Sequence, residues 1–181
     1  MRKDLNSLLL CLVCLAVLSP KVLSAEDDRS GWLKFGVMVA ADTVDQDEDF
    51  EQYEVFLTHS LPWRRIGETW SFFTHLDMTA GMIADSEKTT SIGSIGPRFG
   101  FHQNDGPMIV DIGSRVTLVG DDKLGVRVLD GPVHFSSHAR IGFRLFKKTE
   151  IGFRLQHMSN AGLSNRNPGL DLFVIDVGHY F

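Results

Sequence analysis

Three side chains near the C-terminal end of the chain have the residue types of a hydrolytic triad: His157, Ser159 and Asp171. A serine hydroxyl is a weak nucleophile until a neutral imidazole takes its proton. A carboxylate that binds the other imidazole nitrogen fixes the tautomer and stabilises the imidazolium that forms. These residue types indicate attack on an ester, through an acyl-enzyme that water then hydrolyses.

The local pattern places the three residues at the junction of two β-strands. Residues two apart in a strand share a face and lie roughly 6.6 Å apart, so His157 and Ser159 are neighbours. Asp171 begins the next strand, in phase with Phe173 and Ile175. Pairing the two strands as a hairpin brings Asp171 opposite His157 or Ser159.

The loop between these strands offers donors for the oxyanion that develops during acyl transfer. The candidates are Asn160, the backbone N–H of Gly162, and Asn167, and the sequence does not choose among them. The other histidines have no metal-ligand spacing, and the acidic run at 42–49 lacks the glycine and spacing of a calcium loop. We therefore expect no metal ion and no cofactor.

Alternation of apolar and polar residues with a period of two recurs along the chain, which is typical of β-strands. It is clearest at 70–83 and 133–145, where apolar side chains occupy one face. The chain is therefore predicted to be all-β, an eight-stranded antiparallel transmembrane β-barrel. The other strands are expected near 31–41, 50–61, 88–101 and 106–119, with two more beginning near Glu150 and Asp171.

Turn lengths and the positions of charges favour a barrel of the bacterial outer membrane, with its apolar face toward lipid. A soluble periplasmic barrel that binds a lipid inside is the alternative, because soluble barrels turn the apolar face inward. Phe181 ends the chain in phase with the apolar stripe, and Asp111 and Arg115 are expected to form an interior ion pair. Short turns are expected at 62–67, 102–107 and 147–148, and longer connections at 42–49, 120–131 and 160–169.

The first 25 residues are predicted to be a secretory signal peptide outside the folded domain. Arg2 and Lys3 precede an unbroken apolar run of 11 residues, Leu8–Leu18, which is too short to span a bilayer. Cleavage is expected after Ala25, with cleavage after Ser24 as the alternative.

Length and composition exclude several classes of protein. The 181 residues suit one domain, predicted to span 26–181. A net charge of -5 argues against a general nucleic-acid binder, which needs a basic patch. A mean hydropathy of -0.02 and the lack of a long apolar run exclude a helical membrane protein. Cys11 and Cys14 both lie in the signal segment, so 26–181 has no thiolate chemistry.

The face that carries the triad residues points to a lipid substrate. His157, Ser159 and Asp171 continue the apolar stripe of their strands, so in a membrane barrel they point at lipid. A basic group there costs roughly 2–4 kcal/mol at the bilayer midplane and much less near the interface. With both termini on the periplasmic side, this junction lies at the outer leaflet, where lipopolysaccharide resides.

The segment His157–Gly162 (HMSNAG), followed by Asn167–Leu170 (NPGL) and an acid, resembles the lipid A 3-O-deacylase family (PagL type). The resemblance implies an outer-membrane β-barrel serine esterase that removes the 3-hydroxyacyl chain ester-linked at position 3 of lipid A. It also implies that Ser159, His157 and Asp171 form the triad. The acid of the family is typically glutamate, whereas this chain has aspartate.

The expected partners are lipid A in lipopolysaccharide and other outer-membrane lipids, without nucleic acid, and a homodimer is left open. The alternative function is a non-enzymatic small outer-membrane barrel with a structural or adhesive role. In that case the polar residues only cap strand ends, and Asn167-Pro168-Gly169 forms an ordinary turn.

Overall fold

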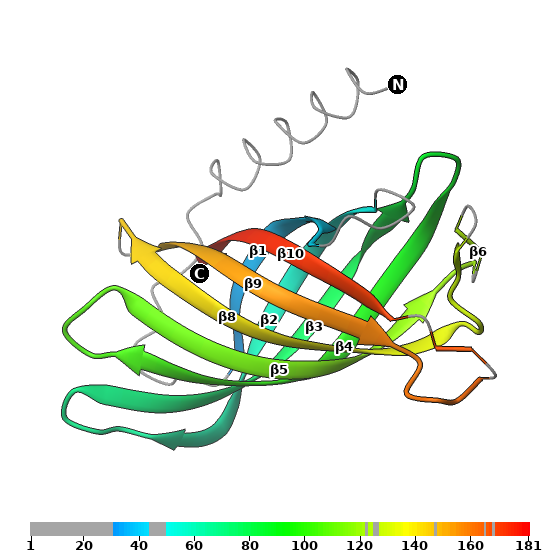
Figure 1. The fold of residues 1–181 in the computed structure, drawn as a ribbon. Helices are drawn as coiled ribbons and strands as arrows, with labels where there is room; N and C mark the ends of the chain where they lie inside the picture. The colour runs from blue at the N-terminus through cyan, green and yellow to red at the C-terminus, as the bar shows by residue number, and fades with distance from the viewer. Residues whose placement is uncertain are drawn as a thin grey trace.

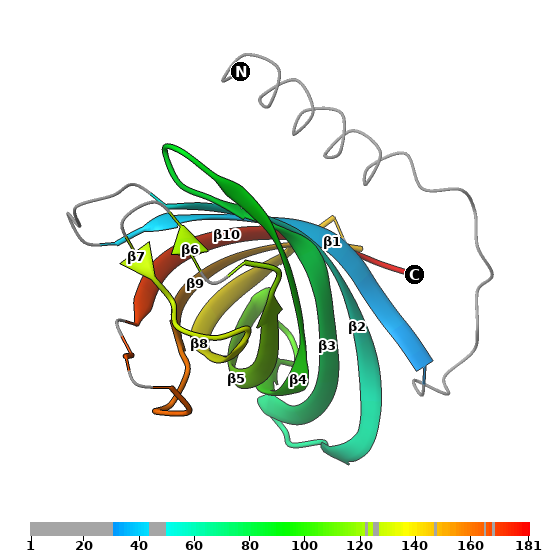
Figure 2. The ribbon, with the colours of Figure 1, turned by 90° about the vertical axis from the view of Figure 1, so that its right-hand side faces the viewer.

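The computed structural model describes residues 31–181 apart from 44–49, 122, 125–126, 147, 165 and 168. In this part of the chain, eight strands form a closed antiparallel barrel in the order β1-β10-β9-β8-β5-β4-β3-β2, as Figure 1 and Figure 2 show. No helix among these residues is long and apolar enough to cross a membrane. The predicted signal peptide lies outside the described residues and stays a prediction.

The predicted eight-stranded barrel is confirmed, with strand ends that differ by a few residues. The barrel strands are β1 (Gly31–Asp42), β2 (Glu51–Arg65), β3 (Trp70–Ala84), β4 (Thr89–Gln103), β5 (Met108–Val119), β8 (Val133–Leu145), β9 (Thr149–Ser159) and β10 (Leu170–Tyr180). A small hairpin that the sequence did not predict, β6 (Lys123–Leu124) with β7 (Arg127–Val128), lies in the β5–β8 connection.

Strand β2 continues past its predicted end, because its pairing with β3 resumes at Arg64 after an irregularity that follows Ser60. Pro62 lies inside this irregularity and has no N–H to give to the ladder, so it resembles a strand terminus in the sequence. The hydroxyl of Thr74 donates a hydrogen bond to the carbonyl of Trp63 at 2.8 Å, which holds the displaced segment against β3.

The barrel is polar inside and apolar outside, which is the arrangement of a transmembrane barrel. Burial alternates along β9 and β10, and the inward residues include Arg154 and Asp176. This burial pattern contradicts the soluble-barrel alternative. Large apolar side chains are exposed on the outside of the barrel strands β2, β3, β4, β5, β8, β9 and β10. They include Val55, Met78, Ile95, Phe99, Ile112, Val116, Ile141, Phe143, Phe153, Leu155, Phe173 and Ile175.

Arg140 is the centre of the interior charge network. Its guanidinium donates to both oxygens of Asp176, at 2.8 and 2.7 Å, and to Asp111 at 3.0 Å. It also pairs with Glu150 at 2.5 Å, and Glu150 in turn accepts a bond from Lys34 at 2.8 Å. Buried charges are costly unless they are paired, and each charge of this network lies beside an opposite charge.

The predicted ion pair between Asp111 and Arg115 is wrong. Residues four apart in one strand are separated by roughly 13 Å, too far for a direct contact. The partners lie on other strands: Asp111 binds Arg140, and Arg115 donates to the side-chain carbonyl of Gln156 at 2.6 Å.

The lumen is apolar at the end that carries the 160–169 loop. A cluster of buried apolar residues fills this end, and its members Phe50, Met158, Leu170 and Leu172 are at most 1% exposed. Period-two alternation did not predict this apolar end of the interior. The other described members of the cluster are Met38, Ala40, Phe56, Ile83, Ile92, Val119, Leu129 and Val174.

Two glycines make room for the guanidinium of Arg140. A Cβ atom added at Gly152 would lie 2.1 Å from Nη2 of Arg140, and one added at Gly142 would lie 2.5 Å from Nη1. Neither clash can be relieved without disturbing the bonds of Arg140 to Asp176, Asp111 and Glu150.

We predict that Gly152→Ala lowers the free energy of unfolding by about 1–3 kcal/mol, the usual cost of overpacking. Urea unfolding in detergent micelles, followed by tryptophan fluorescence, measures this change. Gly93→Ala is the control, because its Cβ would meet its nearest neighbour, the carbonyl of Thr79, at 3.4 Å. Equal stability of the two variants would contradict the packing argument.

Candidate active site

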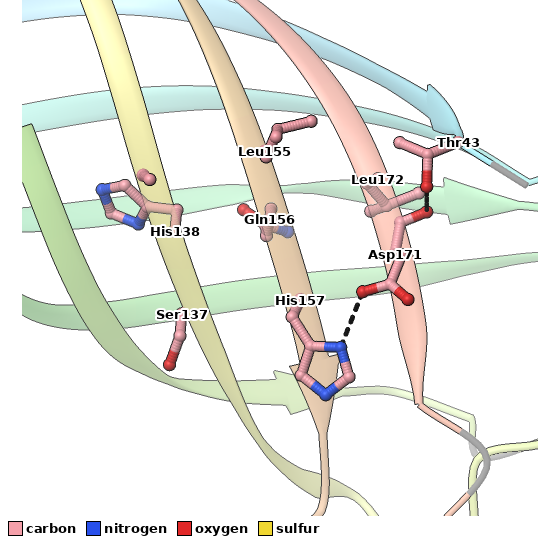
Figure 3. A pocket seen from close by; sticks show the side chains of 9 residues that line it. Thr43, Ser137, His138, Leu155, Gln156, His157, Asp171 and Leu172 are labelled. Atoms are coloured by element: carbon pink, nitrogen blue, oxygen red, sulfur yellow. Dashed lines mark hydrogen bonds and ion pairs between the residues drawn. The ribbon is translucent and has the colours of Figure 1, made fainter.

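The pairing of β9 with β10 places Asp171 directly opposite His157, which resolves the two alternatives left by the sequence. Nδ1 of His157 and Oδ1 of Asp171 lie 2.7 Å apart, and Figure 3 shows the two side chains meeting on the outside of the barrel. Their side chains are 55% and 53% exposed. With the Nδ1 proton donated to the carboxylate, Nε2 carries the lone pair of a general base.

Ser159 is the last residue of β9 and lies on the same face of the strand as His157. It is half-buried and stands opposite Phe135 of β8. Among the described contacts there is no hydrogen bond between its hydroxyl and His157. The structure therefore brings the histidine and the acid into contact and places the serine beside them along the strand.

Hydrogen bonds from Thr43 and the burial of two leucines fix the start of β10, and these contacts hold Asp171 in place. The backbone N–H and the hydroxyl of Thr43 both donate to the carbonyl of Asp171, at 3.2 and 3.3 Å. The flanking Leu170 and Leu172 point inward and are fully buried in the apolar cluster. The sequence did not single out Thr43, because it falls in a region predicted to be a loop.

Asn160 holds the loop that follows Ser159. Its side-chain NH₂ group donates to three backbone carbonyls, and only 1% of the residue is exposed. Two of these carbonyls belong to the β5–β8 connection, so Asn160 ties that connection to the site. The acceptors are the carbonyls of Arg166 at 2.6 Å, Asp130 at 3.1 Å and Leu129 at 3.4 Å.

The predicted oxyanion donors Asn160 and Gly162 are both engaged within the loop. The N–H of Gly162, whose φ is 79°, donates to Oδ1 of Asn160 at 3.0 Å. The side-chain oxygen of Asn167 accepts a hydrogen bond from the backbone N–H of Asn160, also at 3.0 Å. This bond fixes the position of the Asn167 side-chain amide, whose NH₂ group is a hydrogen-bond donor. The assignment of an oxyanion donor among these residues stays a prediction.

An outward-facing pocket of about 420 Å³ lies against the His157–Asp171 pair. Figure 3 shows Ser137 of β8 on the side of His157 away from Asp171, and the strand register pairs Ser137 with His157. Sequence reasoning missed Ser137, although it interrupts the apolar stripe between Phe135 and Ala139. The outward lining consists of Thr43, Ser137, Ala139, Leu155, His157 and Asp171.

No group of three or more histidine, cysteine, aspartate or glutamate side chains that could hold a metal ion occurs within the described residues. The described part of the site offers a base, an acid and hydroxyl groups.

Comparison with known proteins places the chain in a family. The sequence model described as lipid A 3-O-deacylase (PagL) matches residues 51–180. The chain belongs to this family. The resemblance carried by HMSNAG at 157–162 and NPGL at 167–170 is thereby confirmed.

Individual relatives in the PagL family are distant. A lipid A deacylase PagL from Bordetella bronchiseptica is 29% identical over 72 residues, which make up 40% of this chain and 40% of that protein. The crystal structure described as the outer membrane enzyme PagL matches with a TM-score of 0.66 and 19% identity, over 80% of this chain and 98% of the other. This match shows that the two chains share the fold.

We predict that Asn160→Ala makes the 160–169 loop more accessible, since three carbonyls lose their shared donor. Tryptic cleavage after Arg166 in the detergent-solubilised barrel should become at least severalfold faster. Asn104→Ala is the control, because Asn104 binds the carbonyls of Gly67 and Glu68 at the opposite end of the barrel. Equal cleavage rates in the two variants would contradict the role given to Asn160.

Proposed function

We propose that this chain is an outer-membrane serine esterase that hydrolyses the 3-O-linked 3-hydroxyacyl chain of lipid A. Ser159 is the nucleophile, His157 the general base and Asp171 the acid that orients it. One observation carries the proposal: the 2.7 Å contact between His157 and Asp171 lies on the apolar exterior of a barrel from the lipid A 3-O-deacylase family.

The exterior position of the site suits a substrate that is dissolved in the membrane. Leu155 and Phe173, the outward neighbours of His157 and Asp171, are 61% and 41% exposed. Acyl chains can lie against such a surface, while the ester approaches the polar residues at the strand ends. A water-soluble ester would gain nothing from this placement.

The length of the turns and the position of the C terminus support an orientation with the site at the outer leaflet. Outer-membrane barrels have short turns on the periplasmic side and longer loops outside. Figure 1 shows the C terminus at the end away from the 160–169 loop and the β6–β7 hairpin. The β9–β10 junction then faces lipopolysaccharide, whose lipid A forms that leaflet.

In the first half of the reaction, the Ser159 hydroxyl attacks the carbonyl carbon of the 3-O-linked ester and gives its proton to Nε2 of His157. The carboxylate of Asp171 stabilises the imidazolium through Nδ1. Asn167 is the proposed donor to the oxyanion, with Asn160 and Gly162 forming the loop that holds it. Collapse expels the sugar oxygen, which takes the proton from His157, and leaves an acyl group on Ser159.

In the second half, His157 takes a proton from a water molecule, which attacks the acyl group on Ser159. The second tetrahedral intermediate collapses and returns the proton from His157 to the serine oxygen. The products are a free 3-hydroxy fatty acid and lipid A with a free hydroxyl at position 3. Asp171 remains ionised throughout, since its task is to orient and stabilise the imidazole.

We predict that Ser159→Ala abolishes deacylation. Mass spectrometry of lipid A from cells that express the wild-type chain should show a species lighter by one 3-hydroxyacyl group, and the variant should not produce it. Ser91→Ala, a lipid-facing serine on β4, is the control and should behave as wild type. Unchanged lipid A in wild-type cells that contain the folded barrel would favour the non-enzymatic alternative.

Substitutions of Asp171 test the role of the acid. Asp171→Asn should lower kcat by about 10³–10⁴-fold, because an amide cannot stabilise the imidazolium and favours the wrong tautomer. Asp171→Glu should retain hydrolysis, since it restores the acid usual in the family. Heat-dependent gel mobility checks that each barrel is folded. Complete loss of activity in a folded Asp171→Glu barrel would contradict the assignment.

A further inference from the structure

A row of polar side chains crosses four strands on the lipid-facing surface. The register pairs Asp171 with His157, His157 with Ser137, and Ser137 with Ser114 of β5. His157 thus has the acid on one side and a hydroxyl on the other. Ser159 lies diagonally from Ser137 across β8 and β9, a separation of roughly 7–8 Å.

The two hydroxyls of this row bind each other in otherwise apolar surroundings. Oγ of Ser114 and Oγ of Ser137 lie 3.2 Å apart, and both residues are exposed. Their outward neighbours on β5, Ile112 and Val116, are 59% and 44% exposed. A hydroxyl facing hydrocarbon needs a partner, so each serine supplies one to the other.

The pair keeps hydrogen-bonding capacity for a third group. One hydroxyl proton is used in the mutual bond, so one proton and several lone pairs remain. Within the described residues, the hydroxyls of Ser114 and Ser137 have no side-chain hydrogen bond other than this mutual one. Both serines are exposed on the outside of the barrel, and Ser137 lines the pocket together with His157 and Asp171.

We infer that Ser137, backed by Ser114, binds the 3-hydroxyl of the scissile acyl chain and makes the enzyme selective for hydroxylated chains. This inference rests on the proposed function. The hydroxyl of a 3-hydroxyacyl ester lies two carbons from the carbonyl carbon that Ser159 attacks. With the carbonyl at Ser159, the chain can run across β9 toward β8, where Ser137 meets the hydroxyl and Ala139 and Leu155 meet hydrocarbon. Ser137 is therefore a specificity-determining residue of the acyl site.

The test compares two substrates that differ by one oxygen atom: lipid A with a 3-hydroxytetradecanoyl group at position 3, and the analogue with plain tetradecanoyl. The wild-type enzyme in micelles should favour the hydroxylated ester in kcat/KM. Ser137→Ala should lower this preference by roughly tenfold, the worth of one neutral hydrogen bond, by slowing hydrolysis of the hydroxylated ester. Ser137→Thr should restore the preference, since it keeps the hydroxyl.

Two further variants sharpen the test. Ser114→Ala should reduce the preference in the same direction by a smaller factor, because Ser137 loses the partner that orients it. Ser91→Ala should keep the wild-type preference, since it removes an exposed hydroxyl on β4, which β8 and β5 separate from β9.

The outcomes separate this inference from the proposed function. A wild-type enzyme that hydrolyses neither ester overturns both. An active enzyme whose preference is unchanged by Ser137→Ala overturns the inference alone. Equal loss of both hydrolyses in Ser137→Ala also overturns it, because Ser137 would then serve His157 or the chemical step rather than the acyl hydroxyl.

Discussion

The barrel depends on the pairing of opposite charges inside it. Arg140 contacts three carboxylates from three strands, and Lys34 adds a further cation on Glu150. Five basic and five acidic residues are buried in the described part of the chain, so the interior is balanced in formal charge. Because the charged side chains pair inside the barrel, the outward positions are free for Phe, Ile, Leu and Val. The candidate site therefore lies on an apolar surface.

Each strand near the site serves the interior and the exterior at once. On β9, Arg154 faces the lumen and His157, three residues further along, faces outward; on β10, Asp176 faces the lumen and Asp171, five residues earlier, faces outward. A shift of one residue in the pairing would exchange the two sets completely. The contacts that fix the register, such as the interior bond of Arg140 to Asp176, therefore also align His157 with Asp171.

Much of the architecture could be predicted from period-two alternation, which identified eight strands and the outward phase of His157 and Asp171. The short turn after Leu145 even fixes the register that pairs Ser137 with His157, since Leu145 pairs with Thr149. What could not be predicted depends on contacts between segments distant in sequence. Asn160 binds the carbonyls of Leu129 and Asp130, and Thr43 binds the carbonyl of Asp171. The irregularity in β2 was hidden because Pro62 resembles a strand end.

The packing inside the barrel bears on how a substrate reaches the site and how a product leaves it. Phe50, Met158 and Leu170 are buried at the loop end of the lumen, and the salt bridges of Arg140 lie deeper in the barrel. His157 lies on the exterior of the barrel, so a lipid substrate would reach it sideways within the membrane. Released fatty acid would leave by the same lateral route and stay among the surrounding lipids, where its detergent-like character acts on the membrane itself.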